Sequence, residues 1–321
     1  MSEKKAMRIV FMGTPEFAVN SLRYLVEDGW NIVGVITAPD RKAGRGQKLK
    51  SSAVKVYAQS QGLPILEPHN LKAPEFISEL KKLEADLQVV VAFRMLPEMV
   101  WNMPPKGTIN LHASLLPNYR GAAPINWAII NGETTTGLTT FFLQHEIDTG
   151  DILLQKEIAI DDKETAGSLH DKLMIQGGPL LAQSLQLIYI GNFTLRKQEV
   201  EQSRIKPAPK IFSRDCEINW NQPAKLVDAF IRGLSPYPTA WCMLKHKEHK
   251  IQKRLKVYSC SIAETSSNKN LPSEIEVIDR QIFIQTADQK IELQEIQLEG
   301  KQKMSAKDLL NGFLIQEYYL I

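Results

Sequence analysis

The feature that most constrains the fold is the segment 86–92, D-L-Q-V-V-V-A, which is the strongest signal for a buried strand in the chain. Near the start, the apolar runs 9–12 and 31–36 enclose a helix-like pattern, which predicts a β-α-β unit. Strands continue to alternate with amphipathic segments as far as the helical pattern at 125–130. This alternation predicts a doubly wound, Rossmann-like and mostly parallel α/β sheet.

The remainder of the chain follows a different pattern. Residues 137–160 read as a β-hairpin and 165–190 as one long helix, after which the composition shifts toward Lys, Arg and Pro with little periodicity. Short, alternating, turn-bounded runs then recur up to residue 298, which is typical of a small OB-like β-barrel. We therefore predict an N-terminal domain 1–196, a linker 197–210 and a smaller C-terminal barrel domain 211–321.

Bulk composition limits the class of protein. The 321 residues suit two domains, and contents of 43% hydrophobic and 23% charged residues are ordinary for a soluble globular protein. The three cysteines show no C-x-x-C spacing, the N-terminus lacks a secretory apolar region, and no run is long enough to span a bilayer. We expect a cytoplasmic monomer with reduced thiols and no membrane partner.

A basic segment, 37–50, follows the second predicted strand. Five Lys or Arg side chains stand in the ten positions 41–50, together with two glycines. Ligand crevices of open α/β sheets lie at the carboxyl ends of strands, so this location suits contact with a phosphate backbone. A solvated charged loop is the alternative explanation. The turn after the first strand has Gly13 and no G-x-G-x-x-G fingerprint, which disfavours a nicotinamide cofactor.

The segment 107–124 carries the best candidates for chemistry. It begins as a short strand, on which Asn110 and His112 project to the same side because strand side chains alternate. An amide that can hydrogen-bond an oxygen, beside an imidazole that can handle a proton, forms a plausible catalytic pair. On these two residues alone, a capping asparagine and a half-buried structural histidine are the simpler interpretation.

A set of short motifs extends along nearly the whole chain: F-M-G-T-P-E-F-A at 11–18, P-D-R-x-A-G-R-G at 39–46, N-x-H-x-S-L-L-P at 110–117, R-G-A-A-P-I at 120–125, D-T-G-D at 148–151, P-x-P-x-A-W at 236–241 and M-S-A-x-D-L-L at 304–310. With these motifs the chain resembles the methionyl-tRNA formyltransferase family. N-x-H, S-L-L-P and D-T-G in this order are specific for formyltetrahydrofolate-using enzymes. The choice of acceptor depends on the basic segment and the C-terminal domain.

The resemblance implies transfer of the formyl group of the co-substrate 10-formyltetrahydrofolate to the α-amino group of initiator methionyl-tRNA, with no metal. It implies a catalytic trio of Asn110, His112 and Asp148. It also implies folate contacts from Ser114, Leu115, Leu116 and Pro117, and tRNA contacts from Arg41, Lys42, Arg45, Lys48 and Lys210.

The chemistry of formyl transfer agrees with this trio. A free α-amine has a pKa of about 7.7–8.0, so a histidine that titrates near neutrality is suited to accept its proton during attack. Attack on the formyl carbon builds negative charge on oxygen, which an amide N–H of Asn110 could stabilise. Asp148 could orient His112 and stabilise its cation, or take part in the proton transfer itself, and the sequence leaves both roles open.

Two departures from the family pattern affect the predicted pocket. The segment 93–97, F-R-M-L-P, is one residue shorter than the usual form and lacks its glycine, which changes the backbone that typically contacts the pterin. Glu146 stands where a glycine is usual, two positions before Asp148, so we expect a less permissive turn.

Three other hypotheses fit parts of the pattern. The acceptor could be glycinamide ribonucleotide, or a nucleotide-linked amino sugar, or the chain could bind tRNA or folate without catalysis. Residues 207–321 argue against the ribonucleotide, because enzymes of that kind are similar only over the first domain. The motif at 39–46 is not expected in the amino-sugar enzymes. The intact trio argues against a pure binding protein.

Overall fold

The structure is a computed structural model that describes residues 6–43, 48–198, 205–263 and 271–321. Its contacts divide the chain into two compact units, which we describe separately. Unit 1 consists of Met1–Gly121, Thr135–Ala159 and His170–Pro207, and unit 2 of Ala122–Thr134, Ile160–Leu169 and Ala208–Ile321. Because these units interleave along the chain, the contiguous division into 1–196, 197–210 and 211–321 stays a prediction.

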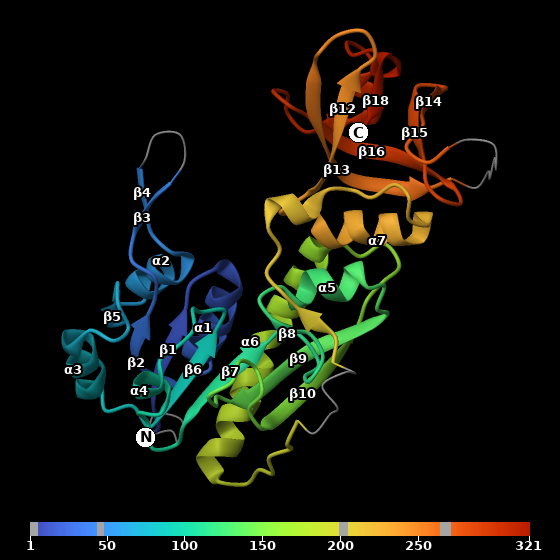
Figure 1. Cartoon of the computed structure of the whole chain (residues 1–321). Coiled ribbons are helices and arrows are strands. Elements are labelled where there is room, and N and C mark those ends of the chain that lie inside the picture. The colour runs from blue at the N-terminus through green and yellow to red at the C-terminus, as the bar shows by residue number, and fades with distance from the viewer. Residues whose placement is uncertain (1–5, 44–47, 199–204, 264–270) are drawn as a thin grey trace. The chain divides into compact units, whose positions relative to one another are not determined.

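Unit 1 is built on a seven-stranded sheet with the order β10-β9-β7-β6-β1-β2-β5 (Figure 1). Its strands are β1 (Arg8–Gly13), β2 (Asn31–Ile36), β5 (Ile65–Leu66), β6 (Leu87–Val91), β7 (Thr108–His112), β9 (Thr135–Phe142) and β10 (Ile152–Ala159). The five strands from β7 to β5 pair in parallel, and β7-β9 and β9-β10 pair antiparallel. The predicted doubly wound, mostly parallel sheet and the predicted hairpin at 137–160 are therefore confirmed.

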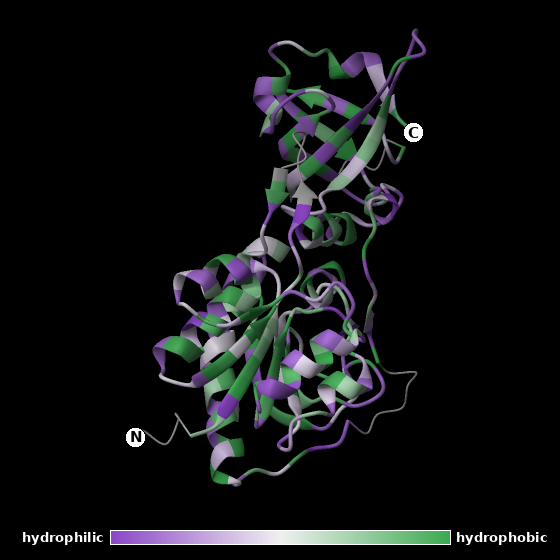
Figure 2. Ribbon diagram, turned by 90° about the vertical axis from the view of Figure 1, so that its left-hand side faces the viewer, coloured by the Kyte–Doolittle hydropathy of each residue, from purple (hydrophilic) through white to green (hydrophobic). Residues whose placement is uncertain are grey.

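Helices connect these strands and cover the sheet. They are α1 (Glu16–Glu27), α2 (Ala53–Ser60), α3 (Pro74–Lys82), the short α4 (Glu98–Trp101) and α6 (Ala166–Ile190). The whole of β6 is buried, as its apolar run predicts, because it lies in the middle of the sheet. Figure 2 shows the strands of this sheet coloured mostly as hydrophobic. None of the helices in the described ranges has the length and apolar character needed to cross a bilayer.

The register of the parallel strands determines which face of the sheet carries Asn110 and His112. Met12 pairs with Val90 and Val90 pairs with Asn110, so these three side chains form one row on one face of the sheet. Met12 and Val90 belong to a buried cluster with Phe76 of α3, which identifies the helix that covers this face. The alternate residue Leu111 contacts α6 on the opposite face. Asn110 and His112 therefore share the α3 side of β7.

Unit 2 contains a second, antiparallel sheet that forms a nearly closed barrel with the order β14-β15-β16-β13-β12-β18 and with β17 paired to β16. Its strands are β12 (Ala240–His246), β13 (Gln252–Ile262), β14 (Ile275–Ile278), β15 (Gln281–Gln285), β16 (Lys290–Leu298), β17 (Met304–Ser305) and β18 (Tyr318–Leu320). The helices α5 (Pro124–Ile130) and α7 (Ala224–Leu234) pack on each other where Gly233 leaves room for Ile130. The predicted C-terminal barrel is confirmed.

Four details differ from the sequence-based expectations. The run 274–286 is two strands, because Asp279 and Arg280 both adopt positive φ, at 48° and 63°, and close a tight hairpin. The closing helix at 304–312 is reduced to α8 (Ala306–Leu309) behind β17. The basic segment 37–50 contains the strands β3 (Arg41–Ala43) and β4 (Lys48–Lys50), which form antiparallel arms rather than a plain loop. The expected linker contains β11 (Pro207–Ala208).

The remaining elements are short. They are β8 (Arg120–Gly121) and the 3₁₀ helices η3 (Ser213–Cys216) and η4 (Ile315–Glu317).

Candidate active site

Asn110 and His112 lie at the carboxyl end of β7, on one face of the strand as the alternation of side chains predicts. Asn110 is partly exposed, whereas His112 is only 7% exposed. Within the described part of the chain, the amide of Asn110 has no hydrogen-bond partner. Its N–H groups are thus available to a ligand at this edge of the sheet.

The two ring nitrogens of His112 have different neighbours. Nε2 lies 2.8 Å from the backbone carbonyl oxygen of Tyr119, a group that can only accept a hydrogen bond. In the neutral imidazole, Nε2 therefore carries the hydrogen and Nδ1 carries the lone pair. Nδ1 lies 3.7 Å from Oδ2 of Asp148. A proton accepted by His112 would arrive at Nδ1, beside this carboxylate.

Asp148 occupies a strained turn between β9 and β10. Its φ is +55°, a left-handed conformation that Asp tolerates better than most residues. Its Oδ2 accepts a hydrogen bond of 2.9 Å from the backbone N–H of Gly121, which fixes the carboxylate on the side of His112. Thr149 Oγ1 donates to the carbonyl of Glu146 across the same turn at 3.1 Å. The trio predicted from the sequence is thus brought together at one place, and its catalytic role stays a prediction.

Steric crowding explains why the D-T-G motif contains a glycine. A Cβ atom at Gly150 would lie 1.7 Å from the backbone carbonyl oxygen of Phe142, which is far inside van der Waals contact. The unusual Glu146 causes no comparable conflict, because the left-handed residue of this turn is Asp148 and Glu146 does not adopt positive φ. The turn therefore accommodates Glu146 without the glycine that the family usually has there.

The segment 114–117 is folded against the sheet beside the trio. Ser114 Oγ donates to the carbonyl of Asn118 at 2.7 Å, and Thr139 Oγ1 donates to the carbonyl of Ser114 at 2.6 Å. Leu116 is 2% exposed and packs in a small apolar cluster. The side chains of Ser114 and Leu116 are consequently used inside the protein, while Leu115 and Pro117 are partly exposed. Folate contacts from this segment stay a prediction, with its backbone and the latter two side chains as the accessible groups.

The basic residues predicted to bind tRNA are distributed over both units. Arg41 is an exposed residue of β3, and Lys42 and Lys48 belong to the paired strands β3 and β4. Arg45 lies outside the described residues. Lys210 in unit 2 is exposed, and its Nζ lies 5.3 Å from the centre of the Phe212 ring.

A charged cluster that the sequence motifs did not indicate anchors the base of the β3–β4 hairpin. Lys55 Nζ of α2 lies 2.9 Å from Oδ1 of Asp40 and 2.9 Å from Oε2 of Glu67. The hydrogen bond from Lys55 is the main cause of a lowered pKa at Asp40, and the same contacts raise the pKa of Lys55. Both groups are held charged, so the cluster attaches the hairpin to α2 and to the end of β5.

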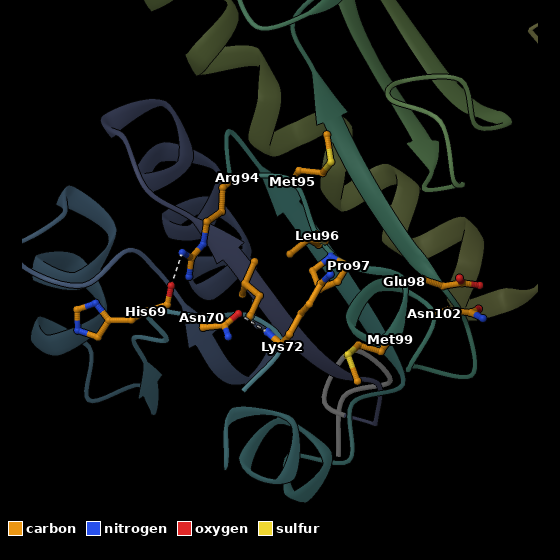
Figure 3. Close-up of a pocket in the computed structure, with 11 residues that line it drawn as sticks. His69, Asn70, Lys72, Arg94, Met95, Leu96, Pro97, Glu98, Met99 and Asn102 are labelled. Carbon is orange, nitrogen blue, oxygen red and sulfur yellow. Dashed lines mark hydrogen bonds between the residues drawn. The ribbon is translucent and has the colours of Figure 1, made fainter. Parts of the chain in front are cut away.

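A cavity of about 1060 Å³ lies at the carboxyl ends of β5 and β6 (Figure 3). It is lined by the shortened segment around Arg94, by the segment around Lys72 and by the start of α4. Arg94 donates to the carbonyl of His69 at 3.0 Å and to the carbonyl of Pro68. Burial is the largest cause of a lowered pKa at Arg94, followed by the charge of Arg41. Arg94 thus replaces the expected glycine with a side chain that joins two walls of the cavity.

A smaller cavity of about 370 Å³ adjoins the turn of Asp148. It is lined by Trp101, Gln144, His145, Glu146 and Thr149. Glu98 lines the first cavity and His145 lines the second, and Oε1 of Glu98 lies 3.5 Å from Nε2 of His145. No three His, Cys, Asp or Glu side chains of the described ranges are grouped as metal ligands.

Family models and curated relatives match nearly the whole chain. The family model described as formyl transferase matches residues 7–185, and the model described as formyl transferase, C-terminal domain, matches residues 210–314. A methionyl-tRNA formyltransferase from Parabacteroides distasonis is 51% identical, with 98% of this chain and 99% of the relative covered. One from Flavobacterium johnsoniae is 49% identical, with 97% and 98% covered.

Solved structures share the fold at lower identity. A sugar 3N-formyl transferase solved in the presence of dTDP and 5-N-formyl-THF matches with a TM-score of 0.65 and 20% identity, over 92% of this chain and 99% of that one. HypX from Aquifex aeolicus in complex with tetrahydrofolic acid matches with a TM-score of 0.61 and 19% identity, over 95% of this chain and 47% of that one. From the two family models and the relatives matched along almost its whole length, the chain belongs to the methionyl-tRNA formyltransferase family.

Proposed function

We propose that this protein transfers the formyl group of 10-formyltetrahydrofolate to the α-amino group of methionyl-initiator-tRNA. The observation that carries the proposal is the arrangement at the end of β7: Nδ1 of His112 lies beside the Asp148 carboxylate, and the amide of Asn110, unpartnered among the described residues, lies on the same face. This arrangement provides a proton acceptor, a countercharge and an N–H donor for an acyl-type transfer. The family to which the chain belongs performs this class of reaction on methionyl-tRNA.

The reaction balances with these groups alone. The amine nitrogen attacks the formyl carbon, and the carbonyl oxygen of the resulting tetrahedral adduct takes the negative charge. An amide N–H of Asn110 stabilises this charge. The amine loses one proton to His112, and N10 of the folate gains one proton as its bond to the formyl carbon breaks. Asp148 stabilises the imidazolium in between, at the 3.7 Å separation that the structure shows.

The larger cavity suits the folate donor. Its volume of about 1060 Å³ exceeds that of a drug-sized ligand site, and its apolar lining includes Met95, Leu96 and Pro97. Lys72 and Arg94 supply positive charge in the same cavity, which matches the carboxylates of the glutamate tail of a folate. We place the donor in this cavity, with its formyl end directed toward Asn110 and with Leu115 and Pro117 among its contacts.

The acceptor is a tRNA, for which basic residues of both units provide phosphate contacts. Arg41 and Lys42 belong to β3, Lys48 belongs to β4 and Lys210 lies in unit 2, while Arg45 is included from the sequence alone because it lies outside the described residues. Lys55 forms ion pairs with Asp40 and Glu67 at the base of the hairpin, and these contacts hold the paired strands β3 and β4 in place. We also propose that the enzyme acts in the cytoplasm and that it is a monomer. Light scattering in solution measures its molar mass and so tests the monomeric state.

The decisive experiment is incubation of the purified protein with 10-formyltetrahydrofolate and charged initiator tRNA, followed by detection of formylmethionine. Uncharged tRNA and a nucleotide-linked amino sugar serve as parallel acceptors. Formylation of methionyl-tRNA alone supports the proposal. Formylation of the amino sugar instead, or no formylation of any acceptor, contradicts it.

A further inference from the structure

Gln198 is connected to both loops that surround the His112–Asp148 pair. Its Nε2 donates to the carbonyl oxygen of Asp148 at 3.0 Å and to that of Gly150 at 2.7 Å. Its Oε1 accepts from the guanidinium of Arg120, at 3.1 Å from Nε and 2.6 Å from Nη2. One carboxamide thus joins the turn that carries Asp148 to the segment that contains Arg120.

The chemistry of these contacts requires an amide. Two carbonyl oxygens need a donor, and a guanidinium needs an acceptor. Glutamate would accept from Arg120 but would place negative charge against two carbonyl oxygens, and methionine would satisfy none of these groups. Gln198 uses both N–H groups and two acceptor positions within the protein, so its orientation is determined by its partners. The guanidinium of Arg120 is partly buried, which lowers its pKa, while the carboxylates of Asp148 and Glu146 oppose this shift.

The residues on either side of Arg120 hold the two catalytic side chains directly. Tyr119 provides the carbonyl that contacts Nε2 of His112, and Gly121 provides the N–H that contacts Oδ2 of Asp148. A displacement of this segment relative to the Asp148 turn would therefore change the separation between Nδ1 of His112 and the carboxylate. Gln198 opposes such a displacement because it contacts both sides, in addition to the hydrogen bond between Gly121 and Asp148 itself.

We propose that Gln198 is a positioning residue for formyl transfer: it locks the segment 119–121 against the turn 148–150 and so maintains the geometry of His112 and Asp148. The inference rests on the proposed function. Its effect should lie in the chemical step, because the carboxamide of Gln198 is fully used inside the protein. A misplacement of about 1 Å at a catalytic group can reduce a rate about 100-fold.

The test compares Gln198→Met, Gln198→Glu and the control Gln176→Met. Gln176 on α6 is a suitable control because its Oε1 also accepts from a cation, Lys156 Nζ at 2.5 Å, and α6 covers the face of β7 opposite to the trio. We expect kcat for formylation of methionyl-tRNA to fall about 10- to 100-fold in both Gln198 variants, with KM for donor and acceptor within about twofold of wild type. The control should retain the kcat of wild type.

Several outcomes would overturn the inference. A wild-type kcat in Gln198→Glu would show that acceptance from Arg120 suffices and that the two carbonyl contacts do not matter. A rise in KM with unchanged kcat would assign Gln198 to binding instead. Thermal unfolding of each variant shows whether the protein is folded. If Gln198→Met does not fold, the kcat of Gln198→Glu decides the inference. An inactive wild type would contradict the proposed function. An active wild type with equally active Gln198 variants would contradict only the role of Gln198.

A spectroscopic measurement separates positioning from a general structural role. The ¹³C shift of the His112 imidazole, assigned by its loss in His112→Asn, reports which ring nitrogen carries the hydrogen. We expect the Nε2–H form in wild type and a mixture of both forms in Gln198→Met. The segment that carries the Tyr119 carbonyl loses its link through Arg120 to the Asp148 turn, while the backbone N–H of Tyr119 still donates to the carbonyl of Lys206. An identical shift in both proteins would contradict the proposed role of Gln198.

Discussion

Nδ1 of His112 lies 3.7 Å from Oδ2 of Asp148, while the other ring nitrogen is held at 2.8 Å by the carbonyl of Tyr119. The separation is longer than a hydrogen bond, so the two groups do not share a proton in this structure, and the carboxylate would stabilise a positive charge that forms on the ring. The backbone carbonyl determines the tautomer, and the carboxylate determines where a positive charge is favourable. The two roles are thus divided between the two sides of one imidazole.

Replacement of His112 by Ala should reduce kcat by about 10²–10⁴-fold, because the proton of the attacking amine loses its acceptor. The fold should survive, since the side chain makes one hydrogen bond to the described residues and lies at a strand end. Steady-state formylation at saturating donor and acceptor measures the effect, with thermal unfolding as the control. Near-normal turnover in this variant would refute the catalytic assignment.

Replacement of Asn110 by Ala should reduce kcat by about 10²–10³-fold, because a preorganised donor to the developing oxyanion is removed. The side chain of Asn110 makes no hydrogen bond among the described residues, so we expect no loss of thermal stability. Donor affinity, measured by equilibrium binding of a non-transferable folate, should change little. A large loss of donor affinity with unchanged kcat would instead make Asn110 a binding residue.

Replacement of Asp148 by Asn tests the charge alone. The new side chain retains an oxygen that can accept from the N–H of Gly121, so the turn should keep its structure. The imidazolium of His112 would lose its countercharge, and we expect kcat to fall by about 10²–10⁴-fold, as for other carboxylates that support a catalytic histidine. Thermal unfolding within a few degrees of wild type combined with this loss would support the assignment. Full activity of the variant would exclude an electrostatic role.

Replacement of Gly150 by Ala tests the geometry of the same turn. The new Cβ would be placed 1.7 Å from the carbonyl oxygen of Phe142, so the backbone must move. We expect a destabilisation of about 1–3 kcal/mol and a lower kcat, because Gln198 holds the carbonyl of Gly150. Gly312→Ala is the matched control, since a Cβ added there would have no neighbouring atom within 4 Å and the φ of Gly312 is not positive. Equal stability of the two variants would contradict the steric argument.

The sequence predicted those parts of the site that depend on local periodicity. Strand alternation placed Asn110 and His112 on one face, whereas Asp148 was assigned to the same site only through the resemblance to the family. Contacts between distant segments could not be predicted in this way. Arg94 reaches the carbonyl of His69 across 25 residues, and Gln198 reaches Arg120 across 78, and no periodic pattern encodes either separation.

The same limit explains the hairpin between β14 and β15. Turns of this type require positive φ at both central residues and usually contain Asn or Gly. Here the central residues are Asp279 and Arg280, so the usual sequence signal is weak and the run 274–286 reads as one strand. Pairing with β16 stabilises β15 and imposes the turn from outside. Arginine disfavours positive φ, and here the tertiary contacts override that local preference.

Replacement of Arg41 and Arg45 by Ala, singly and together, should weaken productive binding of tRNA without changing kcat at saturating acceptor. Each phosphate contact removed should reduce the slope of log K against log salt concentration by about one. Arg41 is exposed on β3, which makes it available for such a contact. Lys82→Ala serves as the control, because Lys82 is an exposed cation at the end of α3, outside the hairpin. Filter binding across a salt series gives the slope. An unchanged slope in the double variant would remove the hairpin from the tRNA site, and an equal change in the control would show that net charge, rather than the hairpin, controls the affinity.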